Sequence, residues 1–331
     1  MPKYSIIIPV FNRPDEIDEL LASLTKQSFH DFEVILVEDG SSKTCQAIAG
    51  HYANQLNVRY FFKENEGQGY ARNYGYQRAE GEVLVVFDSD CLIPPNYFKE
   101  VNDYLGLHQV DAFGGPDTAL DSFTPIQRAI SHTMTSFFTT GGIRGRKKQI
   151  GTYHPRSFNM GITQKVFQKT GGYRIPFMGE DLEFSIRIIT AGFKTALIPN
   201  AFVYHKRRTN LIQFYKQINY FGRARINLTR FHSGHLKLVH LFPLIFVLGF
   251  LCAFILSFLD QKLGFLGIGC YVIYLLLIFL EALLKSKSLK VAFYAPLTAL
   301  IQMSGYAVGL MHEAIQKFRG LDPNKKYIDL Y

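Results

Sequence analysis

The chain has 331 residues, a formal net charge of +9 and a hydrophobic fraction of 48%. This length allows one large domain with an appendage. The basic residues are not interleaved with a nucleic-acid reading motif, so we expect no nucleic-acid partner. The four cysteines show no metal-ligand spacing, and we expect a reducing compartment without disulfides. The opening residues lack a signal peptide, which favours a cytoplasmic location for the bulk of the chain.

The first hundred residues alternate between short apolar strands and helices. Strands are expected at Tyr4–Val10, Phe32–Glu38, Val58–Lys63 and Val83–Phe87. The helices between them are expected at the periodic apolar residues Ile17 to Leu24, around Thr44–Gln55, and after a loop within Gly67–Ala79. This alternation predicts a parallel sheet with helices on both faces.

The next hundred residues combine a loop with a second ordered region. Residues Thr139–Arg156 are rich in glycine and basic residues and lack apolar periodicity, which is typical of a lid, a binding loop or a disordered segment. Order is expected again over Phe158–His205. A helix is predicted around Leu182–Ile189, followed by short strands at Lys194–Ile198 and Ala201–Tyr204.

After Gly234 the chain becomes apolar. The stretches Leu236–Leu259 and Leu263–Leu284 are each long enough to span a bilayer. A third stretch, Val291–Ile315, contains Pro296 and polar residues, so we expect it to span, to be re-entrant or to lie in the interface. We therefore expect a globular domain over residues 1–232, a membrane region over 233–315 and a polar tail over 316–331, in a multi-pass protein of the inner (plasma) membrane.

Basic clusters occur at Arg144–Lys148, Lys206–Arg208 and Arg223–Arg225. They suit anionic headgroups or phosphates, although solvated surface positions would explain any one of them.

Asp88 and Asp90 stand directly after the hydrophobic run Val83–Phe87. Open α/β sheets bind ligands at the carboxyl ends of their strands. Two carboxylates one residue apart at such an end can hold a divalent cation, and hard oxygen ligands suit Mg²⁺ or Mn²⁺. By itself, the Asp-x-Asp pattern fits a solvated turn about equally well.

Taken together, the loop motifs between Tyr4 and about Arg225 resemble those of family 2 glycosyltransferases. The resemblance lies in Ser5–Asn12, Val37–Ser41, Asn65–Asn73, Asp88–Asp90, Gly171–Tyr173 followed by Gly179–Asp181, and Val203–His205. It implies the GT-A fold, an α/β architecture with a Rossmann-like, mixed, mainly parallel sheet and flanking helices. It also implies a nucleotide-diphosphate sugar as donor and Mg²⁺ or Mn²⁺ as cofactor.

The same resemblance implies roles for individual residues. The donor side would comprise Pro9, Phe11, Asn12, Asp39, Asn65, Gly67, Arg72 and Asp88. Asp90 would bind the metal directly, with Asp88 and His205 as further candidates. Glu180, Gln217 and Arg223 would lie on the acceptor or phosphate side. Asp39 in a turn, Arg72 on a helix surface and His205 beside basic residues also fit ordinary structural positions.

Asp181 is the expected general base. Displacement at the anomeric carbon with inversion needs one carboxylate to accept the proton of the acceptor hydroxyl. Glu180 and Asp181 before Leu182 would also favour a helix N-terminus, and both roles can hold together.

Three rival functions remain at this point. Processive members of the family usually carry a Gln-x-x-Arg-Trp motif, but Gln217–Arg225 occupies that region in a chain without tryptophan. We therefore expect one sugar per encounter on a lipid-linked, polyprenyl-phosphate acceptor in cell-surface glycan assembly, with a polysaccharide synthase as the alternative. Gly67-Gln68-Gly69 does not match the dinucleotide-binding pattern of an oxidoreductase. The intact carboxylates of the motifs argue against an inactive scaffold.

Overall fold

The computed structural model describes residues 1–120, 122–141 and 152–322, which form two compact units. Unit 1 joins residues 1–118 to 152–206, and unit 2 joins 119–141 to 207–322. These units differ from the expected division after residue 232, because three helices that precede this residue belong to the same unit as the C-terminal helices. The basic cluster predicted at residues 144–148 lies outside the described residues.

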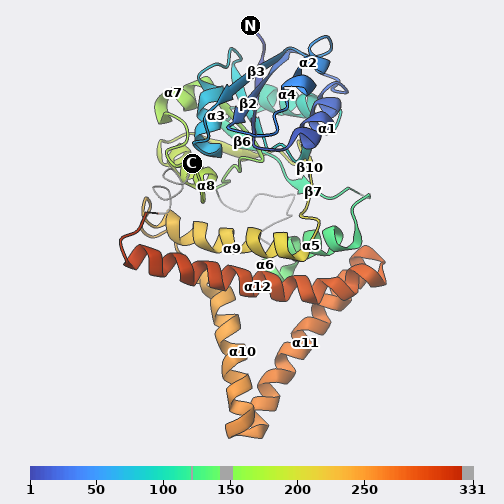
Figure 1. Cartoon of the computed structure of the whole chain (residues 1–331), viewed down its shortest axis with the longest axis vertical. Helices are drawn as coiled ribbons and strands as arrows, with labels where there is room; N and C mark the ends of the chain where they lie inside the picture. Colours follow the sequence, from blue (N-terminus) through green and yellow to red (C-terminus); the bar gives the residue numbers. More distant parts are fainter. Residues whose placement is uncertain (121, 142–151, 323–331) are drawn as a thin grey trace. The chain divides into compact units, whose positions relative to one another are not determined.

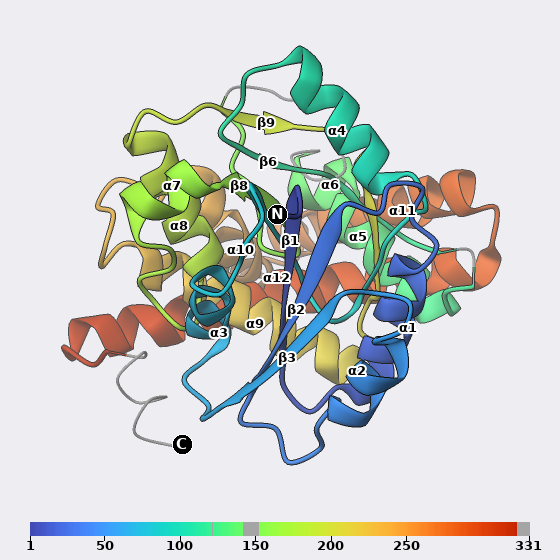
Figure 2. The same cartoon turned by 90° about the horizontal axis from the view of Figure 1, so that it is seen from above.

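Unit 1 is built on a seven-stranded sheet with the strand order β3-β2-β1-β4-β8-β6-β9. Figure 2 looks onto this unit and shows the sheet between its helices. Strand β8 is antiparallel to β4 and β6, whereas the other neighbouring strands are parallel. The expected mixed, mainly parallel α/β sheet is therefore confirmed. The strands are β1 (Tyr4–Val10), β2 (Phe32–Asp39), β3 (Val58–Lys63), β4 (Val83–Phe87), β6 (Ala112–Gly114), β8 (Asn159–Thr163) and β9 (Thr195–Leu197).

Helices cover both faces of this sheet because successive strand residues point to opposite sides. Ile6 and Ile8 pack in the cluster that includes α1 and α4, whereas Ile7 packs in the cluster that includes α3, α7 and α8. One set of helices is α1 (Pro14–Leu24), α2 (Gln46–Tyr52) and α4 (Tyr97–Leu107). The other set is α3 (Gln68–Tyr76), α7 (Gln164–Thr170) and α8 (Glu180–Thr190).

A second, three-stranded sheet forms beside the end of β4. Its order is β5 (Cys91–Leu92), β10 (Val203–His205) and β7 (Asp117–Thr118). The antiparallel pairing of β10 with β5 sets His205 opposite Cys91. This register brings a histidine from the end of unit 1 next to the Asp-x-Asp motif.

Unit 2 is helical. It contains α5 (Pro125–Thr135), α6 (Phe137–Thr140), α9 (Leu211–Leu228), the short 3₁₀ helix η1 (Leu238–Leu241), α10 (Phe242–Leu259), α11 (Gln261–Ser286) and α12 (Leu289–Phe318). Of the predicted loop Thr139–Arg156, residues 139 and 140 belong to α6, and 142–151 lie outside the described residues. Helix α12 is continuous through Pro296.

Helices α9 and α12 lie side by side within unit 2 (Figure 1). Glycines allow their close approach. A Cβ at Gly309 would lie 2.0 Å from the Asn219 carbonyl oxygen, and one at Gly222 would lie 2.2 Å from the Tyr306 carbonyl oxygen. Any larger side chain at these positions would push the two helix backbones apart.

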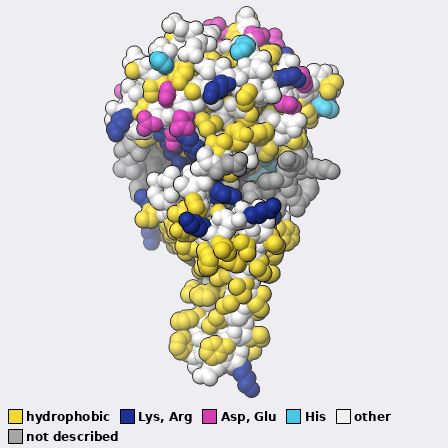
Figure 3. Space-filling model, turned by 90° about the vertical axis from the view of Figure 1, so that its right-hand side faces the viewer, with side chains coloured by type: hydrophobic (Ala, Val, Ile, Leu, Met, Phe, Trp, Pro, Cys, Tyr) yellow, Lys and Arg dark blue, Asp and Glu magenta, His cyan; other side chains and the backbone are white. Residues whose placement is uncertain are grey.

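Three helices of the described chain are long and apolar enough to cross a membrane: Leu238–Leu259, Gln261–Ser286 and Leu289–Phe318. They differ in how much protein surrounds them. The most apolar windows of the first two are 6% and 11% buried, whereas that of the third is 44% buried. Figure 3 shows hydrophobic side chains covering the surface of the α10–α11 hairpin. Helix α12 instead packs along α9 and also contacts α11, α5 and α10.

Candidate active site

Asp90 lies at the centre of a buried polar cluster after β4. Its side chain is 8% exposed, and its Oδ1 lies 3.0 Å from His205 Nε2. Its Oδ2 accepts a hydrogen bond from Arg13 Nη1 at 3.3 Å. The His205 ring is held between two neighbours, because it stacks on Phe158 at 5.3 Å and its Nδ1 lies 4.0 Å from Asp117 Oδ2. Asp90 and His205 thus meet although they are far apart in sequence.

Asp90, Cys91 and His205 offer ligand atoms that lie within 4.8 Å of one another. Burial and the neighbouring Asp90 raise the pKa of the Cys91 thiol well above its usual value. A neutral thiol is a poor ligand for a hard cation. The residues that fit a divalent cation are therefore one carboxylate and one imidazole, a set that suits Mn²⁺ at least as well as Mg²⁺.

Asp88 does not belong to that cluster and is held by a different partner. Its Oδ1 accepts a hydrogen bond from Arg72 Nη2 at 2.9 Å, and Arg72 Nη1 donates to Glu180 Oε1 at 3.0 Å. Arg72 is only 1% exposed, so it is not the surface residue that one interpretation allowed. Burial alone would lower the pKa of Arg72, but Asp88, Tyr173 and Glu180 outweigh it and raise this pKa. Arg72 thus joins the strand end of β4 to the start of α8.

The glycine-rich motif before Arg72 interlocks with the loop before α8. Gly67, with φ of +100°, leaves no room for a Cβ, which would lie 2.7 Å from Pro176 and Phe177 side-chain atoms. The Gly69 amide donates to the Pro176 carbonyl at 3.0 Å. Asn73 exchanges two hydrogen bonds of 2.8 Å with the backbone of Tyr173. The two motifs, about a hundred residues apart, therefore form one structural element.

Asp39 organises the loop that follows β3. Its Oδ1 accepts from Lys63 Nζ at 2.9 Å and from the Glu66 amide at 3.1 Å, and its Oδ2 accepts from the Gly67 amide at 2.9 Å. With three hydrogen-bond donors on a carboxylate that is 4% exposed, Asp39 holds the loop over residues 64–67 in shape.

The other expected donor residues surround the ends of β1 and β2. Pro9 belongs to β1, and Phe11 beyond it is 42% exposed. Asn12, with φ of +55°, accepts hydrogen bonds at Oδ1 from the Ser42 and Lys43 amides. Asn65 has a buried Oδ1 without a hydrogen-bond partner in the described part of the chain. Of these residues, Phe11 presents an exposed side chain that a ligand could contact.

Asp181 lies in the first turn of α8, one residue after Glu180. Its Oδ2 accepts from Arg156 Nε at 2.7 Å, and its Oδ1 accepts from the Leu182 amide at 2.7 Å. Burial would raise the pKa of Asp181, but Arg156 and Arg72 outweigh it, and the pKa is lowered. For Glu180, burial prevails over Arg72 and raises the pKa. Asp181 is therefore the carboxylate that stays ionised and reaches the surface, at 14% side-chain exposure.

Gln217 and Arg223 belong to α9 in unit 2, so they are described apart from the carboxylates of unit 1. Gln217 is half-buried. Arg223 Nε donates at 3.2 Å to Glu313 on α12, and Arg230 Nη2 donates to the same fully buried carboxylate at 2.7 Å. Arg223 is thus engaged in joining α9 to α12.

Sequence reasoning did not identify two cations of this site, Arg13 on Asp90 and Arg156 on Asp181. Arg13 directly follows Asn12 and could have been found from that neighbourhood, whereas Arg156 carries no sequence signal.

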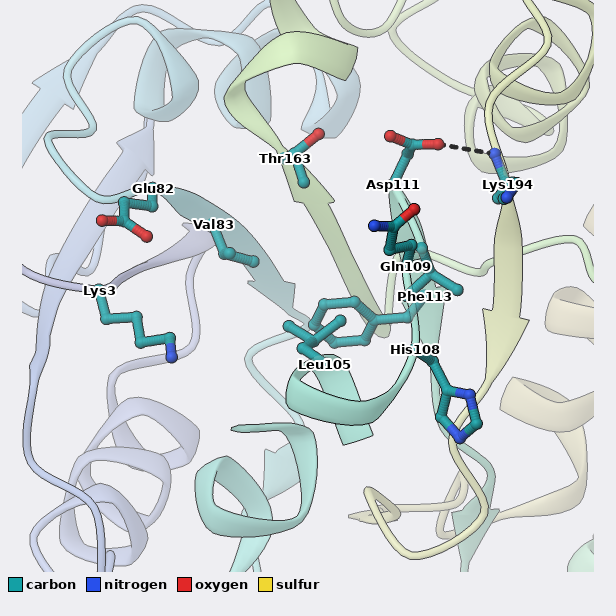
Figure 4. A pocket seen from close by; sticks show the side chains of 11 residues that line it. Lys3, Glu82, Val83, Leu105, His108, Gln109, Asp111, Phe113, Thr163 and Lys194 are labelled. Atoms are coloured by element: carbon teal, nitrogen blue, oxygen red, sulfur yellow. Dashed lines mark hydrogen bonds between the residues drawn. The ribbon is translucent and has the colours of Figure 1, made fainter. Parts of the chain in front are cut away.

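A separate cavity of about 460 Å³ lies at the opposite ends of the strands, where Lys3 precedes β1 and Glu82 precedes β4 (Figure 4). Its charged lining is mixed in sign, with Asp111 and Lys194 beside each other.

The site thus combines a mixed, mainly parallel sheet, an acidic pair at the end of β4 and two carboxylates at the start of α8. The family model "Glycosyl transferase family 2" matches residues 5–171, about half of the chain. The chain belongs to this family, and its class is that of the glycosyltransferases.

Among similar curated proteins is the poly(ribitol-phosphate) beta-N-acetylglucosaminyltransferase TarS of Staphylococcus aureus, 36% identical over 115 residues. That match covers 34% of this chain and 20% of TarS. The putative glycosyltransferase EpsH of Bacillus subtilis is 36% identical over 101 residues, covering 30% of this chain and 29% of EpsH. The chain thus aligns with only about a fifth to a third of these relatives' length.

Two solved structures share the fold over nearly the whole chain. The mannosyltransferase PcManGT of Pyrobaculum calidifontis, in complex with GDP-Man and Mn²⁺, has a TM-score of 0.59 at 15% identity, covering 96% of this chain and 88% of that one. TarS residues 1–349 of S. aureus with UDP-GlcNAc have a TM-score of 0.50 at 18% identity, covering 97% and 93%. At these identities the likeness concerns the fold.

Proposed function

We propose that the protein is an inverting, metal-dependent glycosyltransferase that moves one sugar from a nucleotide-diphosphate sugar to a membrane lipid-linked acceptor. The observation that carries this proposal is the bridge of Arg72 between Asp88 and Glu180. The bridge connects the strand end that would hold the donor to the helix start that carries Asp181. A donor side and a base side built as one element are what a single displacement at the anomeric carbon requires.

The residues divide the chemistry between them. A departing nucleoside diphosphate concentrates negative charge, which a divalent cation would neutralise if held by Asp90 and His205. Asp88 would meet the donor from the neighbouring position, with Arg72 fixing its carboxylate. On the opposite side, Asp181 would accept the proton of the acceptor hydroxyl as the new bond to the anomeric carbon forms. The complexes of PcManGT with GDP-Man and Mn²⁺ and of TarS with UDP-GlcNAc support a donor of this kind.

Unit 2 supports attachment to a membrane. Helices α10 and α11, which are hardly buried by protein, would span the bilayer as a hairpin. Helix α12 shares its surface with α9, which carries basic residues, so the two would lie in the interface. The turn at Asp260–Lys262 would then face outward, and Lys285, Lys287 and Lys290 would remain with the catalytic unit in the cytoplasm.

The test uses the purified full chain with UDP-GlcNAc or GDP-mannose and a polyprenyl-phosphate-linked sugar as acceptor. A product one sugar longer is expected, and excess chelator should abolish its formation. Asp181→Asn should keep donor binding while it lowers transfer by about a hundredfold or more, the usual contribution of a general base. A ladder of long products would favour a polysaccharide synthase instead, and full activity in chelator would exclude the metal role.

A further inference from the structure

The carboxylate that should accept the proton is already occupied. Arg156 Nε lies 2.7 Å from Asp181 Oδ2, while the other oxygen, Oδ1, accepts from the Leu182 amide. The Leu182 bond stays in place as long as α8 does. The oxygen that can be freed for an incoming hydroxyl is therefore Oδ2.

The backbone around Arg156 is fixed, but its side chain reaches solvent. Thr195 Oγ1 donates to the Tyr153 carbonyl at 2.6 Å, and the Asn159 amide donates to the Arg156 carbonyl at 3.0 Å. Ser157 is 5% exposed, and Phe158 stacks on His205. The Arg156 side chain, in contrast, is 31% exposed. It can therefore leave Asp181 by rotating its own bonds, without a change in the fold.

We propose that Arg156 is a positioning residue that holds Asp181 Oδ2 until an acceptor arrives and thereby suppresses transfer of the sugar to water. This inference rests on the proposed function. In the suppressed reaction, a water oxygen would bond to the anomeric carbon and give its proton to Asp181. The bond between that carbon and the diphosphate would break, and the nucleoside diphosphate would leave with the electron pair. A guanidinium on Oδ2 blocks this reaction because it occupies the proton acceptor.

The close pairing of Asp181 with a cation has two opposite effects on it as a base. Arg156 lowers the pKa of Asp181 and so keeps the carboxylate ionised, but it also makes the carboxylate a weaker base. Once the guanidinium moves away, the basicity of Asp181 rises at the moment when a hydroxyl can use it. Water arriving alone meets only the paired form.

The experiment measures release of UDP or GDP from UDP-GlcNAc or GDP-mannose by the full-length protein without any acceptor. Arg156→Met should raise this release about tenfold, part of the usual effect of a general base. In the pH profile of this release, the decrease on the acid side should lie at higher pH for Arg156→Met than for the wild type, because the pKa of Asp181 rises. Arg156→Lys, which keeps a cation, should stay near the wild type. The double variant Arg156→Met, Asp181→Asn should lose the added release.

Arg59→Met is the matched control, because Arg59 is 30% exposed and also pairs with a carboxylate, Glu33, at 2.7 Å. It should leave acceptor-free release unchanged. Thermal unfolding of each variant shows that it is folded. Release that is unchanged or lowered in folded Arg156→Met would overturn the inference alone. No release from either donor and no transfer by the wild type would overturn the proposed function, and the inference with it.

Discussion

Replacing Arg72 with methionine removes the cation from a buried bridge. Arg72 is 1% exposed and the Glu180 side chain 4%, so the variant leaves a buried carboxylate without its partner. Breaking a buried pair in this way costs about 3–5 kcal/mol of unfolding free energy. A domain of about 150–250 residues loses roughly 2–4 °C of melting temperature per kcal/mol. We therefore expect the melting temperature of unit 1 to fall by ~6–20 °C.

The loss should depend on pH. In the wild type, burial raises the pKa of Glu180 and Arg72 counteracts it. Without Arg72 this pKa rises further, so the folded variant retains a proton that the unfolded chain releases above its ordinary pKa of about 4.3. The unfolded state then binds fewer protons than the folded state over that range. The stability of the variant relative to the wild type should therefore fall as the pH rises from about 5 to about 8.

Because the chain has no tryptophan, unfolding is best followed by circular dichroism of the detergent-solubilised protein at several pH values. Arg72→Met combined with Glu180→Gln should recover part of the loss, since no buried charge remains unpaired. Lys99→Met removes an exposed cation paired with Asp103 and serves as the control that leaves the melting temperature nearly unchanged. A decrease below about 2 °C for Arg72→Met, without dependence on pH, would refute the buried-bridge argument.

Three further changes test other parts of the molecule. Cys91→Ser should leave the Mn²⁺ concentration for half-maximal donor turnover nearly unchanged, whereas His205→Ala should raise it by about tenfold or more. An equal increase in both variants would indicate that the Cys91 thiolate is a ligand. Gly309→Val should cost about 1–3 kcal/mol in thermal unfolding, while Gly269→Val, where a Cβ meets nothing within 4 Å, should not. A single cysteine at Leu321, in a chain without its native cysteines, should react with an impermeant reagent only after lysis; labelling of intact cells would place the tail outside.

Most of unit 1 could be predicted from sequence because its signals are local. The alternation in β1, β2 and β4 and the turn residues after them depend on neighbours along the chain. Helix ends were less accurate, as for α2, where seven residues are helical instead of about twelve. The antiparallel direction of β8 could not be derived from its own residues, since it is decided by the strands between which it inserts.

In the site, too, features set by local sequence could be predicted, whereas contacts between distant segments could not. The resemblance put Asp90 and His205 in one predicted metal site, and their side chains lie 3.0 Å apart in the structure. Two partners of those carboxylates did not follow from the sequence, because Arg13 and Arg156 reach Asp90 and Asp181 only after distant segments pack. Likewise, composition marked Val291–Ile315 as apolar, but its burial against α9 depends on glycines whose role appears only in three dimensions.

The interrupted course of the chain through unit 2 has a consequence for handling the protein. Helix α5 precedes about a third of unit 1 in the sequence. Even so, Ile130 and Met134 on it pack in one cluster with Phe214 and Ile218 of α9, and Ile301 of α12 lies against them. A chain cut after residue 232, where the apolar spans begin, would keep α5 and α9 but lose α12. The uncovered apolar surface would then promote aggregation in aqueous buffer. We therefore expect a chain without the three apolar helices to aggregate, and the intact chain in detergent or lipid is the appropriate material for every assay.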